Sequence, residues 1–192
     1  MGIKAALSKP YARITVKKIK KESFCAIDLQ QKVFLSLIEK AKNTVFGKDH
    51  HFDKIKNYED FKKNVPIRDY EKLKSYMERV VNGEENILWP GKPLYLCKTS
   101  GTTSGTKYIP LTKDSMPNHI GSAKNALLCY IAETGKADFV DGKMIFLQGS
   151  PEMQKKNGIP IGRLSGIVAN HVPKYLQKNR MPTYKTNCID DW

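Results

Sequence analysis

The sequence lacks paired cysteines. Its four cysteines, Cys25, Cys97, Cys129 and Cys188, are far apart and form no C-x-x-C pair. Zinc ribbons and dithiol redox motifs depend on such pairs, so neither is indicated, and isolated thiols are typical of a reducing compartment. We therefore expect a cytoplasmic protein.

The sequence also lacks a long apolar run. No segment approaches the roughly 18 consecutive apolar residues that indicate a membrane-spanning helix. The N-terminal residues Met1 to Lys21 are basic but lack the uninterrupted apolar core of a secretory signal. They could bind a membrane surface as an amphipathic arm, but a solvated helix that covers the body of the protein is favoured, and we expect no membrane partner.

Acidic residues are scarce beside basic ones, 19 against 33, which gives a formal net charge of +14. Such a charge attracts anionic partners, and nucleic acid is one candidate. The lysines, however, are spread along helix-like segments with acidic neighbours, as in Glu39-Lys40 and Glu71-Lys72, and no recognition motif accompanies them. We expect no nucleic-acid partner.

A dense cluster of hydroxyls, glycines and one lysine is the most distinctive feature present. It comprises Thr99, Ser100, Gly101, Thr102, Thr103, Ser104, Gly105, Thr106 and Lys107. Glycines let main-chain N–H groups approach an anion, hydroxyls donate hydrogen bonds, and a lysine neutralises charge, so the cluster suits a polyphosphate. Ordinary flexible loops and hairpin turns have the same composition, and composition alone leaves both readings open.

The spacing within the cluster excludes a Walker A loop. Thr106 stands where the second glycine of G-x-x-x-x-G-K-[ST] must be, and Tyr108 follows the lysine. Short apolar and aromatic runs flank the cluster at 94–98 and 108–111, and such runs are typical of β-strands. We therefore predict a hairpin whose strands are joined by this loop.

The loop and its surroundings resemble one family. Residues 99–107 are similar to the phosphate-binding loop of adenylate-forming enzymes, T-S-G-[ST]-T-G-x-P-K, and their variant form resembles the GH3 acyl-acid amido synthetases, bacterial members in particular. The segments that share the resemblance are 61–72, 86–93, 162–168 and 175–192. Ser104 replaces a glycine of the general pattern and Thr106 replaces its proline, which predicts a stiffer loop without the fixed turn.

This resemblance implies a fold, a reaction and a site. The fold is α/β, with a helical lead-in followed by a mixed sheet and flanking helices, as the N-terminal part of an adenylating domain. The reaction is the ATP-dependent ligation of a carboxylic acid to an amino acid through an acyl-adenylate, with Mg²⁺. Residues 99–107 would hold the β- and γ-phosphates of ATP, and no catalytic or metal-binding residue is assigned. Residues 1–27 would form the basic arm and residues 28–192 the domain portion.

The last part of the chain supplies a second set of candidates. A strand expected over 143–148 ends at Gly149 and Ser150, and ligands in α/β sheets bind at the carboxyl ends of strands, although a plain turn fits equally well. By resemblance, the following segment helps to form the acyl pocket, so Arg163, Ser165 and His171 could face a carboxylate. A structural role is favoured for His171, because it has no visible acid–base partner in the sequence.

Periodicity and capping residues predict the helices. Asp28 is a candidate N-cap for a helix towards Thr44, and Asp69 for a helix that Gly83 closes. Gly135 is expected to end a long helix after Thr112, and shorter helices are expected over 56–63, 164–170 and 173–178. The adjacent histidines at 50 and 51 are expected in a loop, since no third metal ligand is evident nearby.

The resemblance also implies elements that do not occur before Trp192: an acidic nucleotide motif, an aspartate for the ribose and a C-terminal lid. We therefore expect an N-terminal fragment without turnover of its own, whose exposed apolar surface leads to self-association. The alternative function is a non-catalytic nucleotide- or anion-binding module that docks to an acidic partner or nucleic acid.

Overall fold

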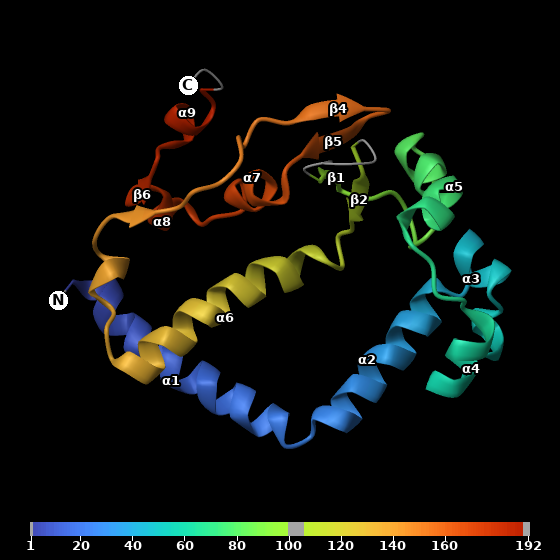
Figure 1. The fold of residues 1–192 in the computed structure, drawn as a ribbon. Helices are drawn as coiled ribbons and strands as arrows, with labels where there is room; N and C mark the ends of the chain where they lie inside the picture. Colours follow the sequence, from blue (N-terminus) through green and yellow to red (C-terminus); the bar gives the residue numbers. More distant parts are fainter. Residues whose placement is uncertain (1, 100–105, 190–192) are drawn as a thin grey trace. The chain divides into compact units, whose positions relative to one another are not determined.

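The computed structural model describes residues 2–99 and 106–189, and its α/β architecture confirms the fold class expected from the sequence (Figure 1). The helices are α1 (Ile3–Ser23), α2 (Ala26–Ala41), α3 (Val45–Asp49), α4 (Tyr58–Asn64), α5 (Tyr70–Val81), α6 (Met116–Thr134), α7 (Leu164–Ala169), α8 (Lys174–Gln177) and α9 (Tyr184–Asn187), with the 3-10 helices η1 (Phe52–Lys54) and η2 (Asp138–Val140). The strands are β1 (Tyr95–Lys98), β2 (Tyr108–Leu111), β3 (Met144–Ile145), β4 (Gln154–Lys156), β5 (Ile159–Gly162) and β6 (Arg180–Met181).

The chain divides into two compact units. The hairpin unit comprises Cys25–Lys113 and Gln154–Ile161. The helix-pair unit comprises Met1–Phe24, Asp114–Met153 and Gly162–Trp192. Each unit has a buried apolar cluster of its own.

The hairpin unit contains a four-stranded sheet with the order β2-β1-β5-β4. β1 and β2 are antiparallel, with Lys98 opposite Tyr108, so the predicted hairpin is confirmed. β4 and β5 form a second antiparallel pair, joined by Asn157 and Gly158. These turn residues have φ angles of 50° and 80°, the positive values that a two-residue type I′ turn requires and that Asn-Gly readily adopts.

The core of this sheet comes from α5, β1, β5 and the segment between α5 and β1. Its buried side chains are Val80, Val81, Ile87, Leu96, Ile159 and Ile161. Each aliphatic side chain of this size contributes about 1.5–3 kcal/mol when it is fully buried. The cluster therefore fixes α5 against the strands that carry the hydroxyl-rich loop.

An aromatic cluster joins the helices that precede α5. Phe52 and Ile55 are buried against Ile38 of α2, and Phe46 meets Phe52 edge-on, with ring centroids 5.9 Å apart. Phe34, Phe61 and Trp89 pack around this cluster. Edge-to-face pairs add to the apolar burial, so the helical lead-in has a core of its own within the hairpin unit.

Caps were predicted for two helices of this unit, Asp28 for α2 and Asp69 for α5, and one of the two is confirmed. The Asp69 Oδ1 accepts a hydrogen bond from the Lys72 N–H at 2.9 Å and caps α5, as predicted. The prediction for Asp28 was wrong, because α2 begins at Ala26 and Asp28 lies in its first turn. A carboxylate there still interacts favourably with the helix dipole. The helix expected over 56–63 begins at Tyr58, where Asn57 is the cap.

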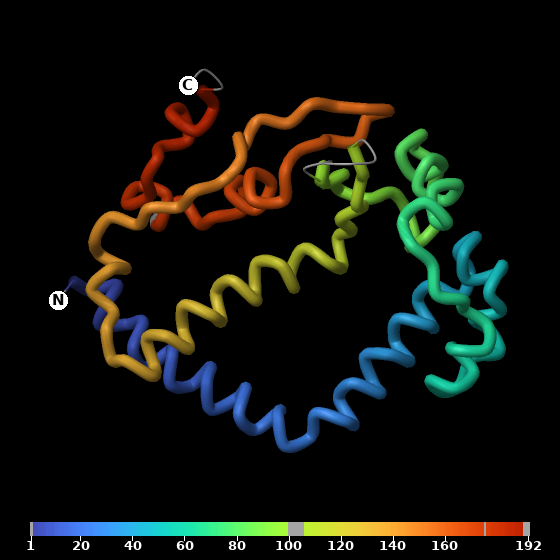
Figure 2. The backbone as a smooth tube through the Cα atoms, viewed as in Figure 1, coloured from blue at the N-terminus to red at the C-terminus, as the bar shows by residue number. Residues whose placement is uncertain are grey.

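The helix-pair unit is named for α1 and α6, which run side by side in opposite directions (Figure 2). Ala5 and Ala12 of α1 are fully buried against Leu128 and Ile131 of α6, because small side chains allow the two helices to approach closely. As predicted, α6 ends at Gly135, whose φ of 68° permits its N–H to bond to the carbonyl four residues earlier.

The strand expected over 143–148 is shorter than predicted. Only Met144 and Ile145 form β3, which pairs in parallel with β6. The partner strand β6 comprises only Arg180 and Met181, and the Phe146 N–H donates to the Met181 carbonyl at 2.9 Å where the pairing ends. Leu147 is accordingly 96% exposed.

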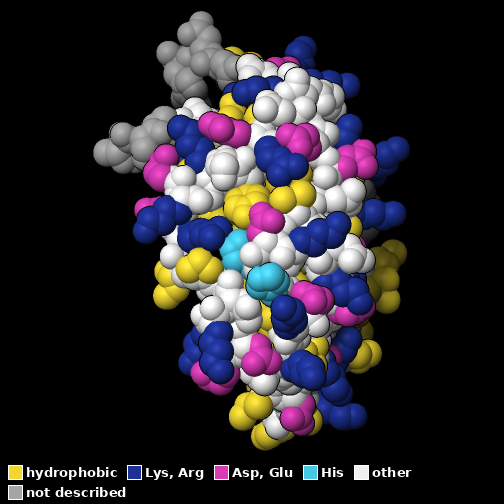
Figure 3. Space-filling view, turned by 90° about the vertical axis from the view of Figure 1, so that its right-hand side faces the viewer, with side chains coloured by type: hydrophobic (Ala, Val, Ile, Leu, Met, Phe, Trp, Pro, Cys, Tyr) yellow, Lys and Arg dark blue, Asp and Glu magenta, His cyan; other side chains and the backbone are white. Residues whose placement is uncertain are grey.

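The face of the molecule drawn in Figure 3 carries charges of both signs. On the face drawn in Figure 3, lysine and arginine side chains alternate with aspartate and glutamate. The described residues also form exposed ion pairs, among them Lys42–Glu39, Lys62–Glu59 and Arg79–Glu84. Across the described part of the chain, no helix has both the length and the apolar character needed to cross a membrane.

Cys97 provides a test of the buried hairpin. It lies in β1, is 6% exposed, and burial raises the pKa of its thiol. Because the thiolate is the reactive species, we expect iodoacetamide to label the exposed Cys25 and Cys129 well before Cys97, and to label all of them at similar rates in urea. Peptide-resolved mass spectrometry measures the rates, and fast labelling of Cys97 in the folded chain would contradict the burial of β1.

Candidate functional site

The hydroxyl-rich loop is closed at its base by the β1–β2 ladder. The Thr99 N–H donates to the Lys107 carbonyl at 3.0 Å, one step beyond the pairing of Lys98 with Tyr108. The first and last residues of the loop are therefore held opposite each other. Of the nine loop candidates, Thr99, Thr106 and Lys107 are described, whereas Ser100, Gly101, Thr102, Thr103, Ser104 and Gly105 lie outside the described residues.

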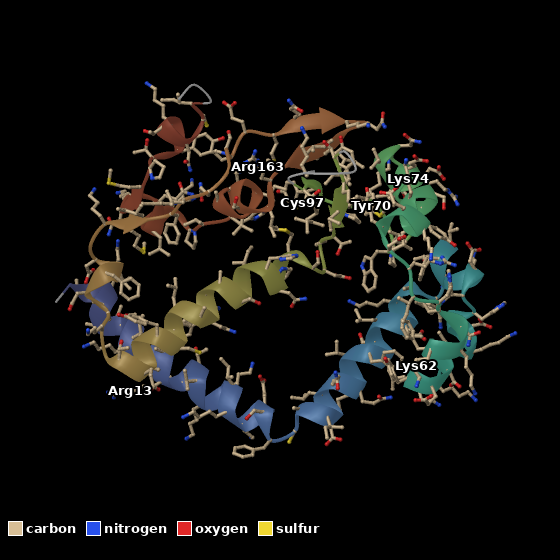
Figure 4. All side chains as sticks on the ribbon, viewed as in Figure 1. Arg13, Lys62, Tyr70, Lys74, Cys97 and Arg163 are labelled. Atoms are coloured by element: carbon tan, nitrogen blue, oxygen red, sulfur yellow. The ribbon has the colours of Figure 1, made fainter. Side chains whose placement is uncertain are left out.

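Tyr70, the first residue of α5, contacts the end of the loop (Figure 4). Its phenol oxygen accepts a hydrogen bond from the Tyr108 N–H at 3.0 Å. Its ring centroid lies 5.2 Å from the Lys107 Nζ, within the range of a cation–π contact. A single aromatic side chain thus touches both Lys107 and the residue that follows it.

Further lysines surround this end of the loop. The Lys98 Nζ donates to the Gln154 Oε1 at 2.9 Å, and the Lys156 Nζ lies 5.4 Å from the centre of the Tyr108 ring. A cavity of about 470 Å³ lies beside them, and its lining includes Tyr70, Glu71, Lys74, Glu78, Thr106 and Lys156. The lysines favour an anion at the loop end, and the two glutamates offset part of the charge of the cavity.

Metal ligation is not evident in the part of the chain that the structure describes: residues 2–99 and 106–189 contain no group of three or more His, Cys, Asp and Glu side chains placed to hold an ion. His50 has a packing role at the end of α3. It is 4% exposed, its ring stacks on Phe46 with centroids 4.0 Å apart, and its Nδ1 lies 2.8 Å from the Phe46 carbonyl oxygen. The structure therefore assigns His50 to the core of the hairpin unit.

The second set of candidates lies in the helix-pair unit. The Gly149 N–H donates to the Ser165 Oγ at 3.0 Å. A Cβ atom at Gly149 would lie 2.6 Å from the Arg163 Cδ, so the glycine leaves room for that side chain. Ser150 follows directly, and its carbonyl oxygen faces Gly166 of α7. The structure thus brings Gly149, Ser150, Arg163 and Ser165 together.

His171 lies beyond the C-terminal end of α7. Ser165 is in the first turn of α7, whereas His171 follows the C-cap residue Asn170, where its N–H donates to the Val168 carbonyl at 3.0 Å. Four of the predicted residues therefore lie at or beside the N-terminal end of α7, His171 lies beyond its C-terminal end, and the five do not form one constellation.

Sequence reasoning missed the surroundings of Arg180. The Arg180 Nη2 donates to the Gln148 Oε1 and its Nη1 donates to the Ala169 carbonyl at 3.3 Å, beside a cavity of about 210 Å³. Burial lowers the pKa of this guanidinium. Tyr70, Lys74 and Lys156 were also missed in the hairpin unit. No local motif could reveal these groups, because their members come from segments far apart in the sequence.

Together, the α/β fold and the hydroxyl-rich hairpin loop with a lysine at its exit match the class of protein that the sequence resembles. The family model described as "GH3 family N-terminal domain" matches residues 15–191, and the chain belongs to the GH3 family.

Named relatives agree with this assignment. An Arabidopsis thaliana protein named indole-3-acetic acid-amido synthetase GH3.15 is 36% identical over 107 residues, which cover 54% of this chain and 18% of that protein. The Nicotiana attenuata jasmonoyl–L-amino acid synthetase JAR4 is 26% identical over 132 residues, which cover 67% of this chain and 22% of the relative. The chain thus spans about a fifth of the length of the curated relatives it matches.

The fold is shared with solved structures. The structure of AtGH3.15 acyl acid amido synthetase in complex with 2,4-DB matches with a TM-score of 0.75 and 22% identity, covering 93% of this chain and 32% of that one. A second structure of GH3.15 acyl acid amido synthetase has a TM-score of 0.65 over 76% of this chain and 26% of its own. At these identities the likeness concerns the fold.

The close approach of α7 to the 149–150 segment can be tested with alanine. A Cβ atom at Gly166 would lie 2.1 Å from the Ser150 carbonyl oxygen, and since that obstacle is backbone, Gly166→Ala should cost about 1–3 kcal/mol of stability. A Cβ atom at Gly121 of α6 would have no described atom outside its own helix backbone within 4 Å. Because alanine favours a helix more than glycine does, Gly121→Ala should raise the free energy of unfolding by up to about 1 kcal/mol. Urea unfolding measures both, and equal effects would contradict the close approach.

Proposed function

We propose that this chain carries the phosphate-binding part of an ATP-dependent acid–amino acid ligase, an acyl-acid amido synthetase that acts through an acyl-adenylate. The observation that carries the proposal is the closed hairpin. Its loop is rich in hydroxyls and glycines, its ends are joined by the Thr99–Lys107 hydrogen bond, and Lys107 stands at its exit. The names of its relatives, which include an Arabidopsis thaliana 4-substituted benzoates-glutamate ligase, support the same reaction class.

In this proposal residues 99–107 bind the β- and γ-phosphates of ATP. Main-chain N–H groups and hydroxyls donate to the phosphate oxygens, and the Lys107 ammonium neutralises part of their charge. ATP, when bound, supplies the adenylyl group that activates the acid and the pyrophosphate that leaves. Because negative charge increases on the departing pyrophosphate, a lysine fixed at the loop exit would stabilise the transition state more than the ground state.

The residues present fit ATP better than they fit a protein-bound metal ion. Lys98, Lys107 and Lys156 lie around the described end of the loop, which suits a polyanion. The described residues offer no carboxylate cluster for Mg²⁺. We therefore propose that Mg²⁺ enters with the phosphate oxygens, as is common where the ion keeps several waters.

The candidate residues for binding the acid and amino acid substrates are chosen by the chemistry of their side chains. Among Gly149, Ser150, Arg163, Ser165 and His171, the Arg163 guanidinium is the group suited to a carboxylate, with Gly149 and Ser165 shaping its surroundings. We also propose a cytoplasmic location, since all four cysteines are free thiols, and a division into a basic arm at 1–27 and a portion of the adenylating domain at 28–192.

Lys107→Ala tests the phosphate grip. Loss of one charge-assisted contact should weaken ATP binding about 10- to 100-fold and leave adenosine binding almost unchanged. Lys62→Ala is a matched control, because Lys62 also lies over a tyrosine ring, at 5.4 Å, but is paired with Glu59 on α4. Calorimetric titration gives the affinities. Equal losses for ATP and adenosine, or equal effects of the two variants, would contradict the proposed role.

ATP–pyrophosphate exchange tests the reaction. With a panel of carboxylic acids and the product of the whole gene, we expect exchange that depends on one class of acid and that Lys107→Ala abolishes. No exchange with any acid, together with salt-sensitive nucleic-acid binding, would instead support the non-catalytic module.

A further inference from the structure

We propose that Tyr70 is a positioning residue for the phosphate-binding loop, which holds Lys107 and the start of β2 in place before the triphosphate binds. The identity of the ligand rests on the function proposed above. The positioning itself rests on the contacts of Tyr70 with two consecutive residues at the loop exit.

The first contact closes an open position on the sheet. Within the described residues β2 is an edge strand, because the order is β2-β1-β5-β4. The Lys107 and Leu111 carbonyls accept hydrogen bonds from the segment that contains β1. Hydrogen-bonded positions alternate along an antiparallel strand, so the backbone groups of Tyr108 and Pro110 face away from β1. Proline has no N–H, which leaves the Tyr108 N–H as the outward donor of β2, and the Tyr70 phenol oxygen accepts it at 3.0 Å.

The second contact restrains the lysine side chain. The Lys107 Nζ lies 5.2 Å from the Tyr70 ring centroid, and both side chains are half-buried. A lysine with four rotatable side-chain bonds normally loses much conformational entropy when it is fixed on a ligand. Since the ring already limits the positions of the ammonium, less of that entropy remains to be lost when a phosphate binds.

Tyr70 is itself held by a rigid element. Asp69 caps α5 at its first turn, and the far end of the helix is anchored by Val80 and Val81 in the core of the sheet. The β1 strand that leads into the loop belongs to the same core through Leu96. The core therefore fixes the position of α5, and Tyr70 on α5 in turn fixes the position of the loop exit.

Conservative variants separate the two contacts. Tyr70→Phe keeps the ring near Lys107 but removes the acceptor for the Tyr108 N–H, and Tyr70→Leu removes both. Tyr76→Phe is the matched control: Tyr76 lies on the same helix and its hydroxyl also forms hydrogen bonds, among them one donated to the Asp49 Oδ2 at 2.7 Å, in another part of the hairpin unit. The full 192-residue chain is used throughout.

Two measurements are made on each variant. Hydrogen exchange of the Tyr108 amide by NMR reports the backbone contact without any ligand. Titration with ATP, inorganic tripolyphosphate and adenosine measures how tightly the chain binds a triphosphate and a nucleoside. We expect Tyr70→Phe to speed hydrogen exchange of the Tyr108 amide and to weaken the binding of both triphosphates about two- to fivefold. Tyr70→Leu should weaken their binding about tenfold, and neither variant should change the affinity for adenosine. Tyr76→Phe should behave as the unaltered chain does.

The outcomes distinguish this inference from the proposed function. If Tyr70→Phe leaves the Tyr108 amide protected, or binds triphosphate as Tyr76→Phe does, the positioning role is overturned while the phosphate grip stands. If the unaltered chain binds neither triphosphate, the proposed function fails, and amide exchange still decides whether Tyr70 fixes the loop exit. Should Tyr70→Leu not fold, Tyr70→Phe carries the test alone.

Discussion

The antiparallel ladder between β1 and β2 is the constraint on which the candidate site depends. Thr99 and Lys107, the first and last residues of the hydroxyl-rich loop, directly follow β1 and precede β2. The ladder fixes both ends of that loop, and the Thr99–Lys107 hydrogen bond sets their separation. The ladder in turn is held by the burial of Leu96 beneath α5 and β5.

The sequence predicted the parts of the hairpin unit that local chemistry controls. Capping by Asp69 follows from a short carboxylate before a helical period, and the hairpin follows from two apolar runs around a breaker-rich loop. The family resemblance followed from the loop at 99–107 together with the segments 61–72, 86–93, 162–168 and 175–192, and the family match over residues 15–191 agrees with it. These features share one property: the residues responsible are neighbours in the chain.

Features that depend on distant residues escaped prediction. Tyr70 and Tyr108 are 38 residues apart, and nothing in either segment indicates that a phenol will accept from that particular N–H. The strand around Ile145 was predicted too long because its length is limited by the two-residue partner β6, which comes from a distant segment. Gln148 and Arg180 likewise meet only after the helix-pair unit has folded. Local patterns contain no information about such pairings.

Pro110 in β2 also bears on how chains of this protein can associate. An exposed sheet edge normally invites a strand from another molecule, since its unpaired N–H and carbonyl groups can continue the ladder. Here one outward donor position is a proline and the other donor is already bonded to Tyr70, so that edge offers carbonyls but no free donor on β2. Growth of an intermolecular β-sheet from the β2 edge is therefore disfavoured, which leaves β4 as the edge of this sheet where a further strand could pair.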